Sequence, residues 1–459
     1  MKDLTTGPIP RHVVQMAVPI AMGMLLQTLY FFVDLYFVSR LGDAAIAGVS
    51  AAGNVMFLVF ALTQTLGVGT VALVSHAVGR KDQPGANHVF NQAVMLAVIC
   101  TAATLVGGYA LAGAYMRFIG ADAATTEAGI TFLHWLIPGL ATQYAIIVGG
   151  SGLRGTGIVK PGMVVQMVTV VLNAILAPIL IAGWGTGHPL GIAGAGLATT
   201  ISSVVGLALL TGYFLKLEHY VGVDAKHLKP DAKVLKRLLN IGLPAGGEFA
   251  MLGIFTGIMY WTMRDFGAAA QAGFGIGSRV MQMIFLPAMA LAFAASPIAG
   301  QNFGAKKYNR VRETFRSAAT IGAVIMAILT GIVQWRPEIF AMPFTSEPAV
   351  LAVCAEFLRY ISWNFVAVGF VFTCSALFQA LGNTWPALGS TATRLITFAV
   401  PTIWIAHRPG FELRLVFLLS VVTMFLQALV SYALLKREFR RRLPTNALNP
   451  PMNADEKPQ

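Results

Sequence analysis

Residues 19–42 read PIAMGMLLQTLYFFVDLYFVSRLG. The stretch is almost wholly apolar and, at about 1.5 Å of rise per residue, it is long enough to cross a bilayer as one helix. Asp34 lies inside it, and Gln27 lies two helical turns earlier on the same face. A carboxylate inside a membrane helix costs about 2.5–3.5 kcal/mol on insertion scales, and such residues usually bind or carry ions. We therefore expect Asp34 to face a protein interior or a water-filled cavity, where a functional role is favoured over a hydrogen bond that only holds helices together.

The whole chain shares this apolar character. Of its 459 residues, 56% are hydrophobic and only 11% are charged, and the mean hydropathy is +0.70. A soluble domain does not need so much apolar surface, whereas a polytopic helical membrane protein does. A transmembrane β-barrel is excluded because the apolar runs are continuous over about 20 residues rather than alternating over about ten. The composition predicts an all-α polytopic membrane protein whose first span stays as an anchor.

Twelve apolar runs are long enough to span a bilayer. They lie near residues 14–38, 48–77, 89–111, 128–150, 162–183, 191–215, 239–262, 273–300, 317–335, 353–380, 387–406 and 413–435. The two termini and the even-numbered loops hold 23 Lys and Arg residues, and the odd-numbered loops hold six. Because basic residues gather on the cytoplasmic side, both termini are expected in the cytoplasm. The net charge of +13 follows this distribution and does not indicate nucleic-acid binding.

The chain repeats itself at a constant offset of 225 residues. Pro19 matches Pro244, and the segment LGDAAIAG at 41–48 matches FGAAAQAG at 266–273. Further on, Gly157 matches Gly382 and Pro161 matches Pro386. Chance similarity between apolar stretches does not place Gly and Pro in register over such a length. The repeat predicts two six-helix halves of the same orientation, related by a pseudo-twofold axis along the membrane normal.

This repeat divides the chain into an N-lobe at 1–215, a basic cytoplasmic linker at 216–237, a C-lobe at 238–440 and a cytoplasmic tail at 441–459. The halves share scaffold residues but differ in chemistry. Asp34 aligns with Met259, and Glu248 of the seventh span aligns with Gly23. Each half therefore keeps its own acid, as expected where packing is common to both halves and function is not.

The sequence was compared with the motifs of soluble enzymes, and none of them indicates catalysis. The segment GSGLRG at 150–155 fits GxGxxG, but it follows an apolar helix rather than a strand, so a glycine turn that ends the fourth span explains it better than nucleotide binding. The sequence holds no HExxH, GxSxG, Walker loop or CxxC, and its histidines are scattered. We expect no enzyme activity, no cofactor and no metal site.

Several polar residues inside the spans are candidates for a transport site. Asp34 and Glu248 are candidates for ion coupling, although a helix–helix hydrogen bond explains Glu248 equally well. For substrate binding we expect a polar cluster built from Gln27, Asp34, Asn173, Thr199 and Tyr144. The 19 Met and 29 Phe residues supply adaptable apolar surface, most of which faces lipid. Arg279 and Arg394 either pair with buried acids or extend toward the membrane surface.

The sequence resembles the multidrug and toxic compound extrusion (MATE) transporters of prokaryotic type. The resemblance rests on the segments VDLYFVSRLGDAAIAGVS, GTVALVSHAVGRKD, LRGTG, GIAGAGLATT and GQNFGAKKYNRV, and it extends from Pro10 to about Arg440. It implies a two-lobed, twelve-helix antiporter that exports organic, often cationic or amphipathic compounds in exchange for H⁺ or Na⁺. The family's first-span acid falls on Asp34, and its fifth-span asparagine falls on Asn173.

Two departures from the family pattern bear on the coupling ion. Ala177 stands where one branch carries an acid, and Glu248 comes about one turn before the usual seventh-span acid, while the tenth span has no acid in its interior. A single carboxylate favours H⁺, because Na⁺ needs several oxygen ligands. A lipid-intermediate flippase of the related superfamily remains the alternative. It would need cations such as Arg279 and Arg394 along its cavity. A membrane enzyme or a channel fits less well.

The expected partners follow from this class. We expect small organic substrates and membrane lipids, no nucleic acid, and a monomer in the plasma (inner) membrane of a bacterium or archaeon.

Overall fold

The computed structural model describes residues 1–444 except 121, 219, 225–227 and 409, and it describes the backbone alone at residues 30–35, 39, 43, 44, 54, 265 and 268. The elements that the described residues form are all helical. In the first half they are α1 (Ile9–Ser39), α2 (Asp43–Gly79), α3 (Gln83–Ile119), α4 (Ala123–Gly155), α5 (Lys160–Ala182) and α6 (Ile192–Lys216). In the second half they are α7 (Ala232–Met263), η2 (Arg264–Phe266), α8 (Ala268–Gly304), α9 (Tyr308–Trp335), α10 (Glu338–Ala341), α11 (Pro348–Ile361), η3 (Ser362–Asn364), α12 (Phe365–Ala380), α13 (Trp385–Ala406) and α14 (Leu413–Arg442).

The backbone repeats the 225-residue offset of the sequence. Helices α2 and α8 have the same length of 37 residues and begin and end at equivalent positions. Positive φ angles recur in equivalent pairs: Gly42 with Gly267, Lys81 with Lys306, Gly157 with Gly382, and Gly185 with Gly410. Lysine rarely adopts positive φ, so its recurrence at the same turn is a specific mark of a repeat. The predicted pseudo-twofold arrangement of two six-helix lobes is confirmed.

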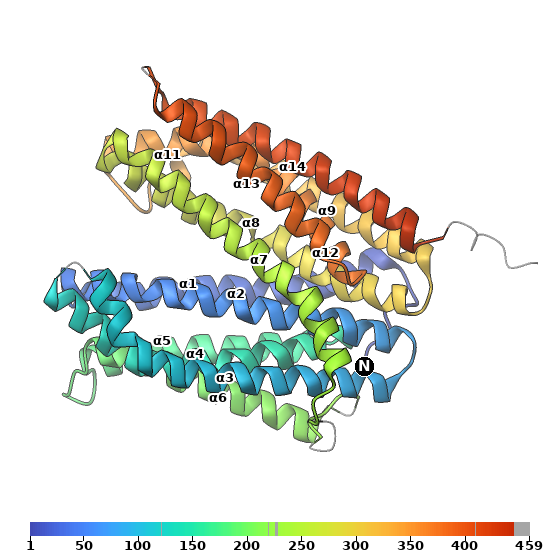
Figure 1. Cartoon of the computed structure of the whole chain (residues 1–459). Helices are drawn as coiled ribbons and strands as arrows, with labels where there is room; N and C mark the ends of the chain where they lie inside the picture. The colour runs from blue at the N-terminus through green and yellow to red at the C-terminus, as the bar shows by residue number, and fades with distance from the viewer. Residues whose placement is uncertain (121, 219, 225–227, 409, 445–459) are drawn as a thin grey trace, which may run out of the picture.

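Figure 1 shows the two lobes as separate bundles, with α1–α6 (blue to green) in the N-lobe and α7–α14 (yellow-green to red) in the C-lobe. Eleven stretches within the described residues are long and apolar enough to cross a membrane, and one of them joins α11 and α12 into a single span. The twelfth span, predicted at 387–406, is helix α13, which is less apolar because it carries Arg394 and several Thr and Ser residues. Together these give the twelve-helix fold.

The lobes meet at the end of the molecule that holds the first residues and the end of α14, here called the terminal end (Figure 1). Gly79 of α2 lies so close to α8 that a Cβ atom there would be 2.0 Å from the Gln301 carbonyl oxygen. The equivalent Gly304 would place a Cβ 2.2 Å from the His76 carbonyl oxygen. Since His76 and Gln301 are themselves equivalent in the repeat, this contact is self-complementary, as in a twofold dimer interface.

Two side-chain hydrogen bonds between the lobes follow the same symmetry. His76 Nε2 donates to the Ala380 carbonyl oxygen at 2.6 Å, and Gln301 Nε2 donates to the Gly155 carbonyl oxygen at 2.9 Å. Ala380 and Gly155 are the last residues of α12 and α4. The helix ends that lack intrahelical partners are thus bonded across the lobe interface, which closes the terminal end.

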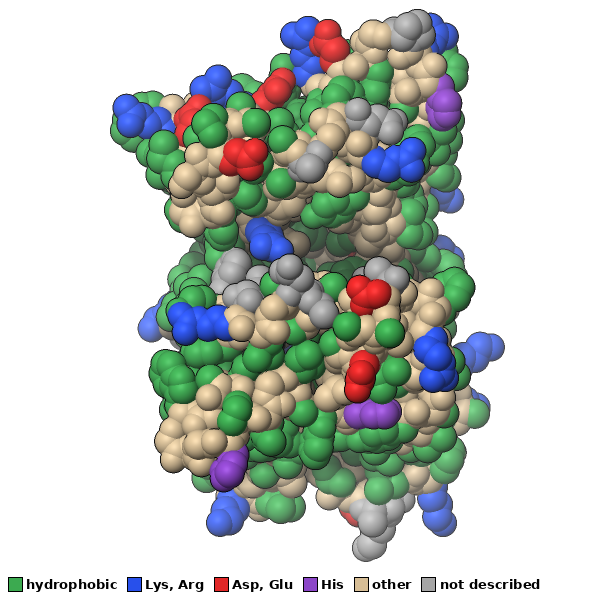
Figure 2. Space-filling model, turned by 90° about the vertical axis from the view of Figure 1, so that its left-hand side faces the viewer, with side chains coloured by type: hydrophobic (Ala, Val, Ile, Leu, Met, Phe, Trp, Pro, Cys, Tyr) green, Lys and Arg blue, Asp and Glu red, His purple; other side chains and the backbone are tan. Residues whose placement is uncertain are grey.

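The opposite end is open between the lobes. Among the described residues, no atom outside their own helix backbone lies within 4 Å of where a Cβ would be at Gly53 of α2 or Gly257 of α7. Figure 2, viewed from this end, shows the surface hollowed between the two lobes. The structure therefore has one closed and one open end.

The first eight residues lie across the closed end. Leu4 is fully buried, and its amide donates to Gln301 Oε1 at 3.0 Å. On the N-lobe side, the Lys2 amide donates to the Thr156 carbonyl oxygen at 2.8 Å. On the C-lobe side, Asn302 Nδ2 donates to the Leu4 carbonyl oxygen at 3.1 Å. This N-terminal segment therefore connects both lobes.

The linker between the lobes is held against α3. Asn91 Nδ2 donates to the Gly222 carbonyl oxygen at 2.9 Å, and Gln92 Nε2 donates to the Lys229 carbonyl oxygen at 2.7 Å. Asp231 ends the linker as the N-cap of α7. Because the capping carboxylate starts α7 at Ala232, the helix begins five residues before the predicted end of the linker at residue 237.

Candidate functional site

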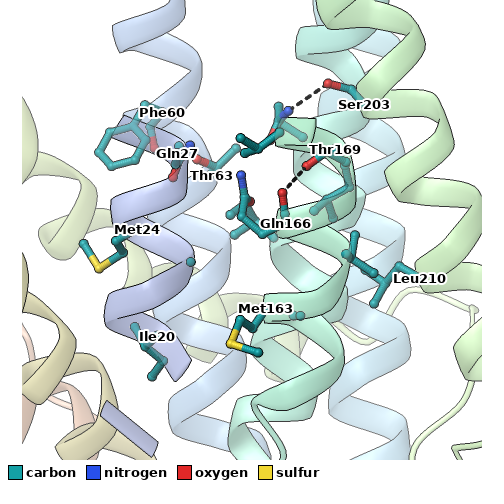
Figure 3. Close-up of a pocket in the computed structure, with 18 of the residues that line it drawn as sticks. Ile20, Met24, Gln27, Phe60, Thr63, Met163, Gln166, Thr169, Ser203 and Leu210 are labelled. Atoms are coloured by element: carbon teal, nitrogen blue, oxygen red, sulfur yellow. Dashed lines mark hydrogen bonds between the residues drawn. The ribbon is translucent and has the colours of Figure 1, made fainter. Parts of the chain in front are cut away.

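A cavity of about 420 Å³ lies inside the N-lobe, between α1, α2, α4, α5 and α6, with Met289 and Phe293 of α8 completing its wall. A cavity of this volume suits a drug-sized organic molecule. Amide and hydroxyl side chains come from all five N-lobe helices: Gln27, Thr63, Gln64, Gln143, Gln166, Thr169, Asn173, Thr199, Ser202 and Ser203. Figure 3 shows Gln27 and Gln166 on the neighbouring helices α1 and α5.

Hydrogen bonds hold some of these polar groups in place. Gln143 Nε2 donates to Ser203 Oγ at 3.2 Å, and Thr169 Oγ1 donates to the Gln166 carbonyl oxygen at 2.8 Å (Figure 3). Asn173, which is fully buried, donates from Nδ2 to Thr199 Oγ1 at 3.4 Å. The network links α4, α5 and α6, so their spacing sets the shape of the polar wall.

Flexible apolar side chains complete the cavity. Met24 of α1, Met163 of α5 and Phe60 of α2 all line it (Figure 3). Methionine side chains adapt to ligands of different shape, and the amides can donate or accept hydrogen bonds. The cavity can therefore hold varied amphipathic molecules without a fixed set of bonds.

The structure brings together most of the substrate-binding residues expected from sequence. Gln27, Asn173 and Thr199 line the cavity. Tyr144 does not: it is fully buried toward α3, where it accepts a hydrogen bond from Thr104 Oγ1 at 3.0 Å. Its helix, α4, presents Gln143 to the cavity instead, because neighbouring residues on a helix point in different directions. The Asp34 side chain lies outside the described residues.

The prediction of a glycine turn at 150–155 was wrong. These residues continue α4 to Gly155, and the glycines allow close packing within the lobe. A Cβ at Gly152 would be 2.6 Å from the Phe90 ring, and a Cβ at Gly155 would be 2.8 Å from the Val74 side chain. As a result Arg154, expected in a loop, lies inside the helix and lines the cavity. Its position was not recognised because its glycine neighbours resemble a turn.

Glu248 lies in a second, much smaller cavity of about 40 Å³ in the C-lobe. Its Oε2 accepts a hydrogen bond from Ser375 Oγ of α12 at 2.9 Å. Met289 and Phe293 line both cavities and stand between them. The small cavity has room for an ion or a water molecule but not for a drug.

The two arginines noted in the sequence lie outside the N-lobe cavity. Arg279 is exposed on α8. The Arg394 guanidinium lies 4.4 Å from the Phe255 ring centroid, and its buried Nε has no hydrogen-bond partner among the described residues. Within the same residues, no group of three His, Cys, Asp or Glu side chains could hold a metal ion.

Comparison with known proteins places the chain in a family. The MatE family profile matches it twice, at residues 19–179 and 244–405, so the two matches begin at the paired prolines of the repeat. The probable multidrug resistance protein YoeA of Bacillus subtilis is 25% identical over 88% of this chain and 86% of its own length. An FAD transporter of Shewanella oneidensis is 23% identical over 87% of this chain and 89% of its own length.

Solved structures share the fold. A MOP superfamily transporter from Pyrococcus furiosus, whose binding pocket is described as having reverse polarity, superposes with a TM-score of 0.89 at 24% identity over 95% of this chain and 97% of its own. The repeat, the two-lobed helical fold and the two profile matches agree. The chain belongs to the MatE family, the multidrug and toxic compound extrusion (MATE) membrane transporters.

Proposed function

We propose that this protein is a secondary active antiporter that exports organic, cationic or amphipathic drug-like compounds in exchange for H⁺, with Na⁺ as the alternative ion. The observation that carries the proposal is the N-lobe cavity of about 420 Å³ with its mixed amide, hydroxyl, methionine and aromatic wall. Gln27, Asn173 and Thr199 would bind the substrate there. The names of two relatives, a probable multidrug resistance protein and an FAD transporter, support an organic substrate.

The coupling roles rest on two acids. Asp34 lies on α1, whose residues Pro19, Gly23 and Gln27 form one wall of the cavity. Protonation of Asp34 would remove the cost of a charge in the membrane, and a shift of α1 would then change the cavity. Glu248, in a space that fits only an ion or water, is proposed as a second ion-coupling group.

The orientation follows from the distribution of basic residues. The terminal end would face the cytoplasm of a plasma (inner) membrane, so the open end would face outward. The lobes would be the segments 1–215 and 238–440, joined by the linker at 216–237, and the protein would act as a monomer that needs no cofactor. Alternating access would then be a rocking of the two lobes around the closed and open ends.

Transport by the purified full chain in proteoliposomes tests the proposal. A fluorescent cation such as ethidium should move in response to an imposed pH gradient, and an imposed Na⁺ gradient should drive it less. Movement with the Na⁺ gradient alone would assign Na⁺ as the coupling ion. Lack of movement with either gradient, in vesicles that contain folded protein, would contradict cation antiport.

A further inference from the structure

Arg154 is the one ionisable side chain among the described residues that line the N-lobe cavity. Its Nη2 donates to Ser151 Oγ at 2.8 Å, and its guanidinium lies 5.5 Å from the Phe293 ring centroid. No acidic side chain in the described part of the chain forms an ion pair with it. A guanidinium remains charged at neutral pH and carries five N–H donors, so most of its donors are left for other partners.

There is space for a ligand beside this cation. Gly150, one turn earlier on α4, also lines the cavity, and in the described part of the chain no atom outside the α4 backbone lies within 4 Å of where its Cβ would be. Gly150 therefore leaves open space in the cavity one helical turn from Arg154.

The repeat shows that helix packing does not require a charge at this position. The C-lobe residue equivalent to Arg154 is Gln379, one residue before the end of α12, just as Arg154 is one residue before the end of α4. Gln379 lines the small C-lobe cavity. An uncharged amide therefore occupies the equivalent position in the C-lobe without disrupting the shared helix packing. The positive charge of Arg154 is specific to the N-lobe cavity.

We propose that Arg154 forms an anion subsite at the terminal end of the N-lobe cavity, where it pairs with the carboxylate of amphipathic or zwitterionic substrates. The inference rests on the proposed transport through this cavity and adds a substrate class to it. A carboxylate matches the planar fork of a guanidinium and forms charge-assisted hydrogen bonds. Phe293, already stacked on Arg154, and Met289 next to it would contact the apolar part of the substrate.

A pair of fluorescent probes that differ only in charge tests the inference. Dansylglycine carries a carboxylate, and dansylglycinamide is neutral with the same fluorophore. Binding of each probe to the detergent-solubilised full chain is measured by fluorescence anisotropy. Arg154→Gln, which installs the residue of the equivalent C-lobe position, should weaken dansylglycine binding at least tenfold and change dansylglycinamide binding by less than twofold. The dansylglycine affinity of Arg154→Lys should lie between those of the wild type and Arg154→Gln, because an ammonium keeps the charge but loses the bidentate geometry.

Arg279→Gln is the matched control, since it removes the same charge from an exposed position on α8 outside the cavity. It should leave binding of both probes unchanged. Equal weakening of both probes in Arg154→Gln would show that Arg154 only maintains the structure and would overturn the inference. Unchanged dansylglycine binding, or none to the wild type, would overturn it as well. Ethidium transport is measured on the same variants. If the dansylglycine test fails but ethidium is still transported, the anion subsite is wrong and the proposed antiport is not.

Discussion

At the scale of single residues, the two candidate coupling acids, Glu248 and Asp34, lie on different helices, α7 and α1. Glu248 has a defined hydrogen-bond donor, Ser375, in a space of about 40 Å³. Asp34 is placed by its helix, α1, which supplies five residues to the wall of the larger cavity: Pro19, Ile20, Gly23, Met24 and Gln27. We therefore expect Asp34, whose helix lines the drug-sized cavity, to couple ion binding to substrate binding. Glu248, in the small cavity, is expected to bind the ion alone.

Asp34→Asn should abolish export without unfolding the protein. The amide is nearly isosteric with the carboxylate but stays neutral, so the group can no longer alternate between a charged and a neutral form. The measurement is ethidium transport in proteoliposomes under a pH gradient, with the thermal midpoint as a control for folding. Export at the wild-type rate would mean that Asp34 is structural.

Glu248→Gln should reduce transport to a few per cent of wild type or less while the thermal midpoint changes little. The amide keeps an acceptor for Ser375 but cannot release a proton. Transport per folded molecule and thermal stability are compared with those of Ser375→Ala, which removes the donor and keeps the acid. If Glu248→Gln lowers stability and leaves the activity per folded molecule unchanged, the residue serves helix packing.

At the scale of helices, glycines determine how closely the lobes approach. Gly79 and Gly53 lie on the same helix, α2. Gly79 touches the Gln301 backbone of α8, whereas no described atom outside α2 lies within 4 Å of where a Cβ at Gly53 would be. The same helix thus packs tightly at one end and is free at the other. This is the arrangement expected of an element that separates from its partner during transport.

Gly79→Ala should destabilise the closed terminal end, and Gly53→Ala should not. A methyl group cannot fit 2.0 Å from a carbonyl oxygen, and forcing extra atoms into packed contacts costs about 1–3 kcal/mol. At Gly53 alanine should be neutral or stabilising, because it favours helix more than glycine does. Thermal midpoints and transport rates of both variants test this. Equal effects of the two substitutions would refute the role of the α2–α8 contact.

The linker contributes a pH-dependent contact at the start of α7. Asp231 caps the helix, and His88 of α3 lies 3.1 Å from its carboxylate. The hydrogen bond from His88, followed by those from the Val234 and Lys233 amides, lowers the pKa of Asp231. Folding therefore favours the charged form. The resulting stabilisation is complete above the unfolded value of about 3.9 and is lost as the pH falls through the lower native pKa.

Asp231→Ala should accordingly lower the thermal midpoint at pH 7, and the difference from wild type should shrink as the pH falls below about 4. Asp231→Asn keeps a capping side chain, so its thermal midpoint should lie between those of the wild type and Asp231→Ala. The thermal midpoints of the three proteins across this pH range provide the measurement. A difference that does not change with pH would show that the cap acts without its charge.

At the scale of the whole molecule, the closed terminal end is held by contacts from three sources. Symmetric contacts join α2 and α8, symmetric hydrogen bonds join His76 and Gln301 to the opposite lobes, and the N-terminal segment lies across both. The opening of this end would have to break all three. Of these three, the N-terminal segment is the one that can be removed without changing a helix of either lobe, because α1 begins at Ile9.

Deletion of residues 2–7 should shift the equilibrium toward opening of the terminal end. Burial of a leucine side chain such as Leu4 is worth about 1.5–3 kcal/mol, which corresponds to about a tenfold to hundredfold change in population. A Ser75→Cys reporter, fully buried on α2 against Gly300, should react faster with a maleimide in the truncated protein. Ser431→Cys, buried against Ser390 within the C-lobe, should react at an unchanged rate. Equal rates at Ser75→Cys would show that the segment does not hold the lobes.

The sequence by itself determined the architecture of this protein. Long apolar runs admit only membrane helices, since the backbone must satisfy its own hydrogen bonds in lipid. Paired Gly and Pro residues at a fixed offset revealed the two lobes, because these residues control local backbone geometry. Three of the expected cavity residues, Gln27, Asn173 and Thr199, could be found because polar side chains inside spans are costly and tend to face one another.

Only the tertiary structure decided which side chains share a cavity. The glycine neighbours of Arg154 have the composition of a turn, so the sequence predicts a loop there. The close packing of Gly152 against Phe90 and of Gly155 against Val74 explains why those glycines are helical. Tyr144 was expected in the cavity but points to α3, since the rotation of a helix about its axis is set by packing against its neighbours. The sequence likewise does not predict which end is closed and which is open. That depends on contacts between the two lobes, whose contacting residues lie about half the chain apart.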